Sequence, residues 1–232
     1  MEIQSHRTEA EALRALTDML ALSVRNKAHG PFNLALSGGA TAAKLFRFWT
    51  DPLETHPNWR TVRFFWVDER CVAPQDSQSN YGEAQRLFFG PMGIPSDRIF
   101  RIRGEIDPGE AAREYTARVA DEVPAAGGIP CFDAIILGVG EDMHTASIFP
   151  GESSLLTAPA GYAVSEHPLS GQRRVTMTGP LILAGRLLLV PVVGRGKAPV
   201  TERLVDPASG DRYPATYLLS RSPQSVLLTD VL

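Results

Sequence analysis

The sequence predicts a protein of the α/β class, with a doubly wound, mainly parallel sheet enclosed between two layers of helices. Short apolar runs alternate along the chain with segments of helical periodicity, a pattern typical of parallel βαβ units. Several of these runs carry almost no charge, as expected of strands that helices cover on both faces. Glycine-rich turns follow some of them, and open α/β sheets bind their ligands at such turns.

Length and composition favour one domain that spans residues 1–232. The chain has 232 residues, of which 44% are hydrophobic, and can bury a full core. Its formal net charge of −3 provides no overall basic field, so nucleic acid is not an expected partner. Cys71 and Cys131 lie far apart and indicate neither a disulfide framework nor a zinc site. A cytoplasmic monomer or small homo-oligomer is therefore expected.

The first half of the chain begins with an expected helix. Apolar residues recur at steps of three and four from residue 8 to about 27, and Gly30 and Pro31 then end the pattern. This N-terminal segment is charged where a signal peptide would be apolar. Two strand, loop and helix units follow, at 32–36, 37–41 and 42–49, and then at 62–67, 68–80 and 81–89.

The second half continues the alternation, with a short strand at 99–102 and a helix at about 108–122. Residues 124–130 hold two glycines and two prolines and predict a surface loop, because an apolar strand at 132–137 follows directly. No apolar run is long enough to span a bilayer. The remaining expected elements are a helical turn at 146–149, edge strands or a hairpin at 163–166 and 174–177, a helical turn at 179–184, a strand at 187–193, a helix at 195–205 and a strand at 224–228.

The segment 132–150, FDAIILGVGEDMHTASIFP, is the strongest candidate for an active site. Gly138 and Gly140 lack a Cβ and allow the main chain to approach a ligand closely. Asp142 lies two residues before His144, near enough in a turn to orient the imidazole of a general base. A histidine that merely begins a helix is the alternative interpretation.

A second glycine loop is expected to bind an anion. It lies between a strand and a helix, so its backbone N–H groups and the helix dipole can meet a phosphate. It lacks the lysine of a nucleotide P-loop, which favours a small phosphate ester over ATP, and a plain tight turn is the alternative. The residues of this loop are Ser37, Gly38, Gly39, Ala40 and Thr41.

Charged side chains also stand where expected strands end. Asp68 and Arg70 follow the apolar run FFWV, and a guanidinium can bind phosphate or polarise an oxygen. Lys197 is placed in the first turn of an expected helix, where a cation is unfavourable unless it faces an anion. Arg174 is a weaker candidate, for which a surface charge is the favoured interpretation.

Several other site types are not indicated. A dinucleotide fingerprint would need a third glycine at the position of Met143. The chain has no G-x-S-x-G nucleophile elbow, no H-E-x-x-H motif and no carboxylate cluster of the kind that holds metals. Neither a cofactor nor a metal is therefore expected.

Taken together, these motifs resemble the 6-phosphogluconolactonase family, within the broader group that includes glucosamine-6-phosphate isomerase/deaminases. LSGGAT is similar to the family's SGG-[ST]-T loop, and WVDERCV to its DER strand end. LGVGEDMHTASIFPG is similar to LG-x-G-x-D-G-HTAS-LFPG, and RVT and GRGKA are similar to later elements. The resemblance extends from the first strand to about residue 204.

The resemblance implies a single Rossmann-like domain that hydrolyses a phosphorylated sugar lactone, 6-phospho-D-glucono-1,5-lactone, in the oxidative pentose phosphate pathway without a cofactor. It implies that His144 activates water and that Arg70 assists at the substrate. The glycine loop and Lys197 would hold the phosphate, while Asp68 and Asp142 occupy the acidic positions of the family.

Two alternatives remain at this stage. One is an amino-sugar-phosphate isomerase or deaminase with Asp68 as the base, although deaminases usually carry GHIAF where this chain has HTAS. The other is a non-catalytic sugar-phosphate sensor. Met143 and Ala42 also depart from the family, which has glycine and commonly proline at these positions. A positive φ at Met143 would cost about 1 kcal/mol or more, and its side chain would then be able to crowd the pocket.

Overall fold

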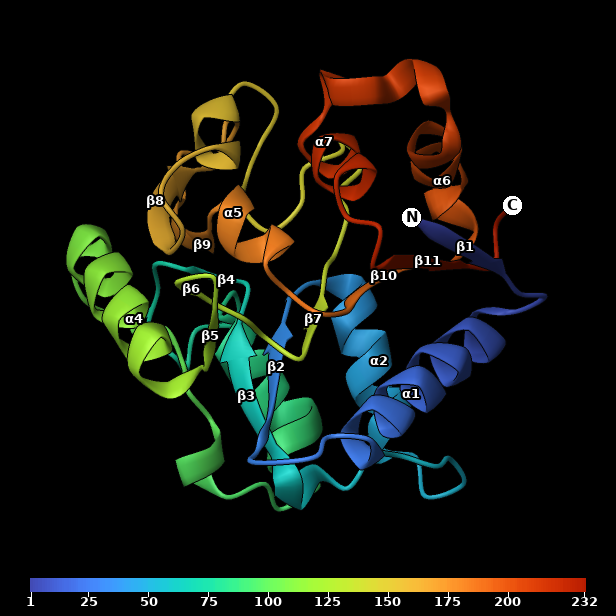
Figure 1. Cartoon of the computed structure of the whole chain (residues 1–232), viewed down its shortest axis with the longest axis horizontal. Helices are drawn as coiled ribbons and strands as arrows, with labels where there is room; N and C mark the ends of the chain where they lie inside the picture. Colours follow the sequence, from blue (N-terminus) through green and yellow to red (C-terminus); the bar gives the residue numbers. More distant parts are fainter.

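A six-stranded, entirely parallel sheet forms the centre of the computed structural model, which describes residues 1–232 (Figure 1). The strand order is β1-β11-β10-β7-β2-β3. The N- and C-terminal ends of the chain lie at the same edge of this sheet, because β1 pairs with β11. The expected parallel sheet is confirmed. Its strands are β1 (Glu2–Ser5), β2 (Phe32–Leu36), β3 (Val62–Trp66), β7 (Ala134–Ile136), β10 (Leu188–Val192) and β11 (Ser225–Thr229).

A small antiparallel sheet lies beside the central one and has the order β4-β9-β8. The expected hairpin is confirmed as β8 (Tyr162–Glu166) and β9 (Arg173–Met177). The expected loop at 68–80 was partly wrong, because its first residues form β4 (Asp68–Arg70) and pair with β9. These three charged residues show no apolar pattern, so only the distant partner strand defines them. The expected loop at 124–130 is a two-residue hairpin, β5–β6 (Ala125–Ala126 and Ile129–Pro130).

Helices flank the central sheet (Figure 1). The hydroxyl of Thr8 accepts a hydrogen bond from the backbone N–H of Glu11 and so caps the first helix, which packs against β10 and β11. The fourth helix packs against β8 and β9. None of the helices is both long and apolar enough to cross a membrane. The helices are α1 (Glu9–Arg25), α2 (Ala40–Thr50), α3 (Asn80–Ala84) with a π-helical extension (Gln85–Phe89), α4 (Pro108–Glu122), α5 (Gly179–Leu183), α6 (Ala198–Val205) and α7 (Pro214–Ser220).

Two expected elements are absent. The helical turn at 146–149 was wrong, because Ala146 has a φ of 53° and the backbone of Ile148 closes a tight turn onto Thr145. The strand at 99–102 was also wrong, since its only ladder contact is a single bridge between Ile99 and Phe64. The short strand β1 and helix α7 were not expected.

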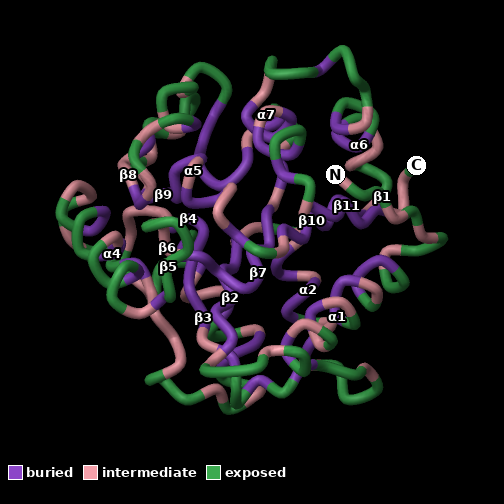
Figure 2. The backbone as a smooth tube through the Cα atoms, viewed as in Figure 1, coloured by how far each residue is buried: buried purple, intermediate pink, exposed green.

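The core explains why the central strands read as uninterrupted apolar runs. Every residue of β2, β10 and β11 is buried, and one cluster of 56 buried hydrophobic residues connects the strands with the helices (Figure 2). Parallel strands covered on both faces need apolar side chains in both directions. Their carboxyl ends, in contrast, are followed by glycine and charged residues, and the functional candidates gather there.

Candidate active site

A cavity of about 190 Å³ lies beyond the carboxyl ends of four neighbouring strands, β10, β7, β2 and β3. The chain passes from β2 outward to β3 and later returns to the other side of β2 with β7. This change of direction is a topological switch point, the position at which open α/β sheets bind ligands. We call this space the site cavity.

The site cavity brings together every candidate from the sequence except Asp142. It also includes residues that the sequence reasoning did not select, of which Asn80 is the most polar. The polar run that ends at Ser79 and Asn80 was the available signal. The lining residues are Ser37, Gly38, Gly39, Ala40, Thr41, Asp68, Arg70, Asn80, Gly138, Val139, Gly140, His144, Ala146, Arg174 and Lys197.

The glycine loop presents the N-terminus of α2 to the cavity. The helix begins at Ala40, earlier than expected, and its N-cap Gly39 has a φ of 89° that favours glycine. No side chain caps this helix, so the N–H groups of its first turn are available to an anion. Ser37 has a different task, because its hydroxyl donates to the carbonyl of Ile136 (2.8 Å) and links the ends of β2 and β7.

Lys197 lies at the N-cap of α6 and also lines the cavity. Its ammonium group donates a hydrogen bond of 2.9 Å to the carbonyl of Val139, in the middle of the turn that follows β7. A cation at the start of a helix opposes the helix dipole. Its position beside the α2 N-terminus therefore favours an anionic ligand between them.

His144 stands at the wall of the cavity, and Asp142 contacts it from outside the cavity lining. The Nδ1 atom of His144 lies 2.5 Å from Oδ1 of Asp142, and the backbone N–H of His144 donates to the same oxygen. Since an ionised carboxylate only accepts, Nδ1 carries the hydrogen, and in the neutral form of the ring Nε2 keeps its lone pair. Partial burial raises the pKa of Asp142, but the charge and hydrogen bonds of His144 outweigh burial and hold that pKa below its ordinary value.

Met143 adopts the positive φ that its position requires, at 68°. Its side chain is 0% exposed, packs into the hydrophobic core and does not line the site cavity, so it does not crowd the pocket. Its carbonyl accepts a hydrogen bond from the backbone N–H of Ala215 in α7 (3.2 Å). Burial of the methionine side chain thus compensates for the strained backbone.

Replacing Met143 separates the stabilisation from its buried side chain from the cost of its strained backbone. Met143→Ala loses the buried side chain and keeps the strain, whereas Met143→Gly loses the side chain and relieves it. We expect Met143→Ala to lower the free energy of unfolding by about 2–5 kcal/mol, and Met143→Gly to lower it by roughly 1 kcal/mol less. Denaturant titration of both variants measures this order, which is the reverse of the usual preference for alanine. An alanine variant that equals or exceeds the glycine variant in stability would contradict it.

Arg70 and Arg174 are directly opposite each other in the register of β4 and β9. The interpretation of Arg174 as a surface charge was wrong, because its side chain is only 12% exposed and lines the cavity. Burial lowers the pKa of Arg174, and Asp68 raises it while the positive charge of Arg70 lowers it further. Like charges in opposed positions of a strand pair repel. Their coexistence here favours a negatively charged ligand.

The side chains of the adjacent residues Asp68 and Glu69 point in different directions. Asp68 lines the cavity, and its carboxylate accepts a 2.6 Å hydrogen bond from the hydroxyl of Ser147. The carboxylate of Glu69 turns inward and accepts from the backbone N–H groups of Arg70, Asn80 and Tyr81 and from the Ser79 hydroxyl. Burial raises the pKa of Glu69 despite these donors. Glu69 therefore holds the loop between β4 and α3 in place.

Asn80 connects the DER segment with the glycine loop. Its side-chain amide donates to the carbonyl of Asp68 (2.9 Å), and its Oδ1 is buried without a hydrogen-bond partner. A Cβ at Gly38 would lie 1.8 Å from that oxygen. The absence of a side chain at Gly38 is therefore a requirement of space, since the φ of Gly38 is not positive.

Gly38→Ala tests this close approach. The added methyl group must displace Asn80, so we expect kcat/KM to fall by about tenfold, as for a small misplacement of binding groups. Steady-state kinetics of the variant measure the loss. Gly196→Ala is the matched control, because Gly196 also lacks a positive φ and a Cβ added there would have no atom within 4 Å. Equal activity of the two variants would argue against the packing role.

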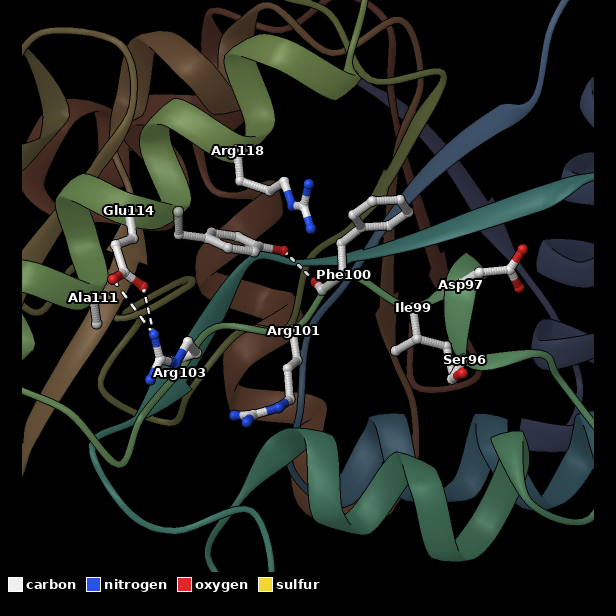
Figure 3. A pocket seen from close by; sticks show the side chains of 10 residues that line it. Ser96, Asp97, Ile99, Phe100, Arg101, Arg103, Ala111, Glu114 and Arg118 are labelled. Atoms are coloured by element: carbon white, nitrogen blue, oxygen red, sulfur yellow. Dashed lines mark hydrogen bonds and ion pairs between the residues drawn. The ribbon is translucent and has the colours of Figure 1, made fainter.

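A second cleft, of about 400 Å³, lies between the 96–103 segment and α4 (Figure 3). Its three arginines already have carboxylate partners, at 2.7 Å for Arg101–Glu105, 3.2 Å for Arg103–Glu114 and 3.1 Å for Arg118–Glu122. The cations of this cleft are therefore neutralised within the protein. The site cavity, where Arg70 and Lys197 have no carboxylate partner and a histidine lines the wall, is the better candidate. No three or more His, Cys, Asp and Glu side chains are grouped so that they could hold a metal ion.

Comparisons with known proteins show what the whole chain is similar to. A family model described as glucosamine-6-phosphate isomerases/6-phosphogluconolactonase matches residues 7–227. The chain is 44% identical to the 6-phosphogluconolactonase of Treponema pallidum (strain Nichols) over 164 residues, which are 71% of this chain and 68% of the relative. It is 36% identical to the 6-phosphogluconolactonase of Aggregatibacter actinomycetemcomitans over 194 residues, which are 83% and 82% of the two chains.

A solved structure has a similar fold over almost the whole chain. The crystal structure of the devB protein superimposes with a TM-score of 0.89 at 35% sequence identity, and the match covers 99% of this chain and 97% of that one. The family model, over residues 7–227, includes all the strand ends that form the site cavity. The chain therefore belongs to the 6-phosphogluconolactonase family, within the glucosamine-6-phosphate isomerase/6-phosphogluconolactonase group.

Proposed function

We propose that this chain hydrolyses 6-phospho-D-glucono-1,5-lactone to 6-phospho-D-gluconate, as a step of the oxidative pentose phosphate pathway. One observation carries the proposal: an imidazole held by a carboxylate stands at the wall of a small cavity that three cations line. The names of the relatives support the choice of substrate.

The phosphate group of the substrate is placed at the N-terminus of α2. The uncapped N–H groups of Ala40 and Thr41 point along the helix axis, and Lys197 stands beside them in the cavity lining. Arg174 contributes a further buried cation to the same space. Together these groups fix one end of the substrate and leave its ring within the cavity.

Hydrolysis then follows from the state of His144. Its Nε2 removes a proton from a water molecule while the water oxygen bonds to C1 of the lactone, and the carbonyl electron pair moves onto oxygen. Arg70 and backbone N–H groups stabilise this oxyanion. When the carbonyl re-forms, the bond between C1 and the ring oxygen breaks, and Nε2 returns the proton to that oxygen. Asp142 stabilises the imidazolium formed between these two steps.

A second candidate is isomerisation or deamination of an amino sugar phosphate. The specific observation that favours it is the Asp68 carboxylate, which lines the cavity and would serve as a base toward carbon. This carboxylate is, however, engaged by the hydroxyl of Ser147 and lies 4.0 Å from Nη1 of Arg174. These contacts make it a better substrate anchor than a proton acceptor.

One assay separates the two candidates. The purified chain is mixed with fresh 6-phospho-D-glucono-1,5-lactone, and release of acid is compared with the spontaneous rate. In parallel, glucosamine 6-phosphate is supplied and ammonia is measured. We expect saturable lactone hydrolysis well above background and no ammonia. Lactone loss at the spontaneous rate, or release of ammonia, would overturn the proposal.

A further inference from the structure

The buried aromatic ring of Phe149 contacts two side chains that line the site cavity, His144 and Arg174. Its centroid lies 4.8 Å from that of the His144 ring, and the guanidinium carbon of Arg174 lies 5.5 Å from it. The ring of His167 packs edge-on against it at 5.1 Å. Phe149 is 1% exposed and does not line the site cavity, so it cannot contact a substrate.

His144 needs this support because its other partner is weakly held. The Asp142 side chain is 46% exposed and that of His144 is 26% exposed, so both belong to a turn at the surface. A hydrogen bond between two such neighbours fixes the tautomer but allows both side chains to move together. A buried ring in contact with the imidazole, tilted by 49° relative to it, restricts that movement, since interiors are closely packed.

The local backbone explains how Phe149 reaches this position. Ala146 has a φ of 53°, which directs the chain away from a helix. Ser147 is then anchored twice, by its backbone N–H to the hydroxyl of Thr176 (3.0 Å) and by its own hydroxyl to Asp68. These contacts carry the chain past the β4–β9 sheet and bring Phe149 beneath both His144 and Arg174.

We propose that Phe149 is a positioning residue, which holds the imidazole of His144 at the angle that directs Nε2 into the cavity. This inference rests on the proposed function, because it assigns the general base to His144. Phe149 acts through His144 and not on the substrate. Its removal therefore lowers the efficiency of the base more than the affinity for the lactone.

Phe149→Leu is the variant that tests the inference. We expect kcat to fall by about tenfold with a smaller change in KM, since misorientation of a catalytic group acts on the chemical step. Phe88→Leu is the matched control, because Phe88 is equally buried in the core and does not line the cavity. The control is expected to lose similar thermal stability while it retains its kcat. Equal losses of kcat in the two variants would show a merely structural role.

A double-mutant cycle gives the decisive result. If Phe149 acts through the imidazole, Phe149→Leu has no further effect on kcat in the His144→Ala background. A tenfold loss that persists in this background would overturn the inference and leave the proposed function intact. If the wild-type chain fails to hydrolyse the lactone, the proposed function fails.

Nitrogen NMR of the histidine rings then still tests the positioning role. The inference predicts that the Nδ1–H tautomer of His144 is kept in both proteins, because Asp142 fixes it, and that the ring signals are sharp in the wild type and broadened by motion of the ring in Phe149→Leu. Identical ring spectra in the two proteins would overturn it.

Discussion

Replacing His144 by alanine is expected to lower kcat for lactone hydrolysis by about 10²- to 10⁴-fold, the usual contribution of a general base. KM should change far less, because in the proposed mechanism the phosphate is held by Lys197 and the α2 N-terminus and not by the imidazole. Steady-state rates, corrected for spontaneous hydrolysis, measure both constants. The loss should affect every concentration of lactone, since the missing group acts on the water and not on binding.

His167 provides the matched control for this prediction. It packs against the other part of the same Phe149 ring but does not line the site cavity. His167→Ala should therefore keep kcat within about threefold of the wild type, because it lacks any contact with the reacting groups. A folded His144→Ala protein with near-normal turnover would refute the assignment of the base.

Gly140→Ala is expected to reduce kcat by about 10²-fold, the order of loss that follows a misplacement of about 1 Å in an active site. A Cβ on Gly140 would lie 2.3 Å from both Cε1 and Nδ1 of His144 and 2.7 Å from Oδ1 of Asp142. The imidazole and its partner must therefore move together. The φ of Gly140 is not positive, so the backbone itself tolerates alanine.

A control variant separates the steric effect of the added methyl group from a general effect of replacing glycine by alanine. Gly196→Ala again serves as the control, since it adds the same methyl group where no atom lies within 4 Å. Thermal unfolding should show that both variants fold, and only Gly140→Ala should lose turnover. If the Gly140 variant keeps full kcat, the imidazole is free to relocate and the close contact with glycine is not required.

The sequence predicted most of the fold because each central strand can be recognised from its own residues alone. Strands such as β2 and β10 are buried at every position, so their residues form uninterrupted apolar runs. Helix α4 was predicted with its observed bounds because Asp107 caps it and Pro108 suits its first turn. The missed β1 is a short, mostly exposed edge strand with no apolar pattern.

The parts of the candidate site that directly follow these strands in the sequence could be predicted. The glycine turns and the Asp142–His144 pair could be recognised because each is complete within a few residues. Arg174 could not be placed, because its burial depends on pairing of β9 with β4, about a hundred residues earlier in the chain. The contact of Phe149 with His144 depends on the positive φ of Ala146. Alanine rarely adopts a positive φ, so the sequence did not predict this turn.

The opposed arginines of β4 and β9 also bear on the stability of the ligand-free protein. Arg70 and Arg174 repel each other across the strand pair, and the Asp68 carboxylate, 4.0 Å from Arg174, offsets only part of this repulsion. If a phosphate ester binds in the cavity, as we propose, it offsets the remaining repulsion and binds only the folded state, so we expect it to raise the melting temperature by mass action. We therefore expect the unfolding and proteolysis of the protein to slow as the concentration of this ligand rises.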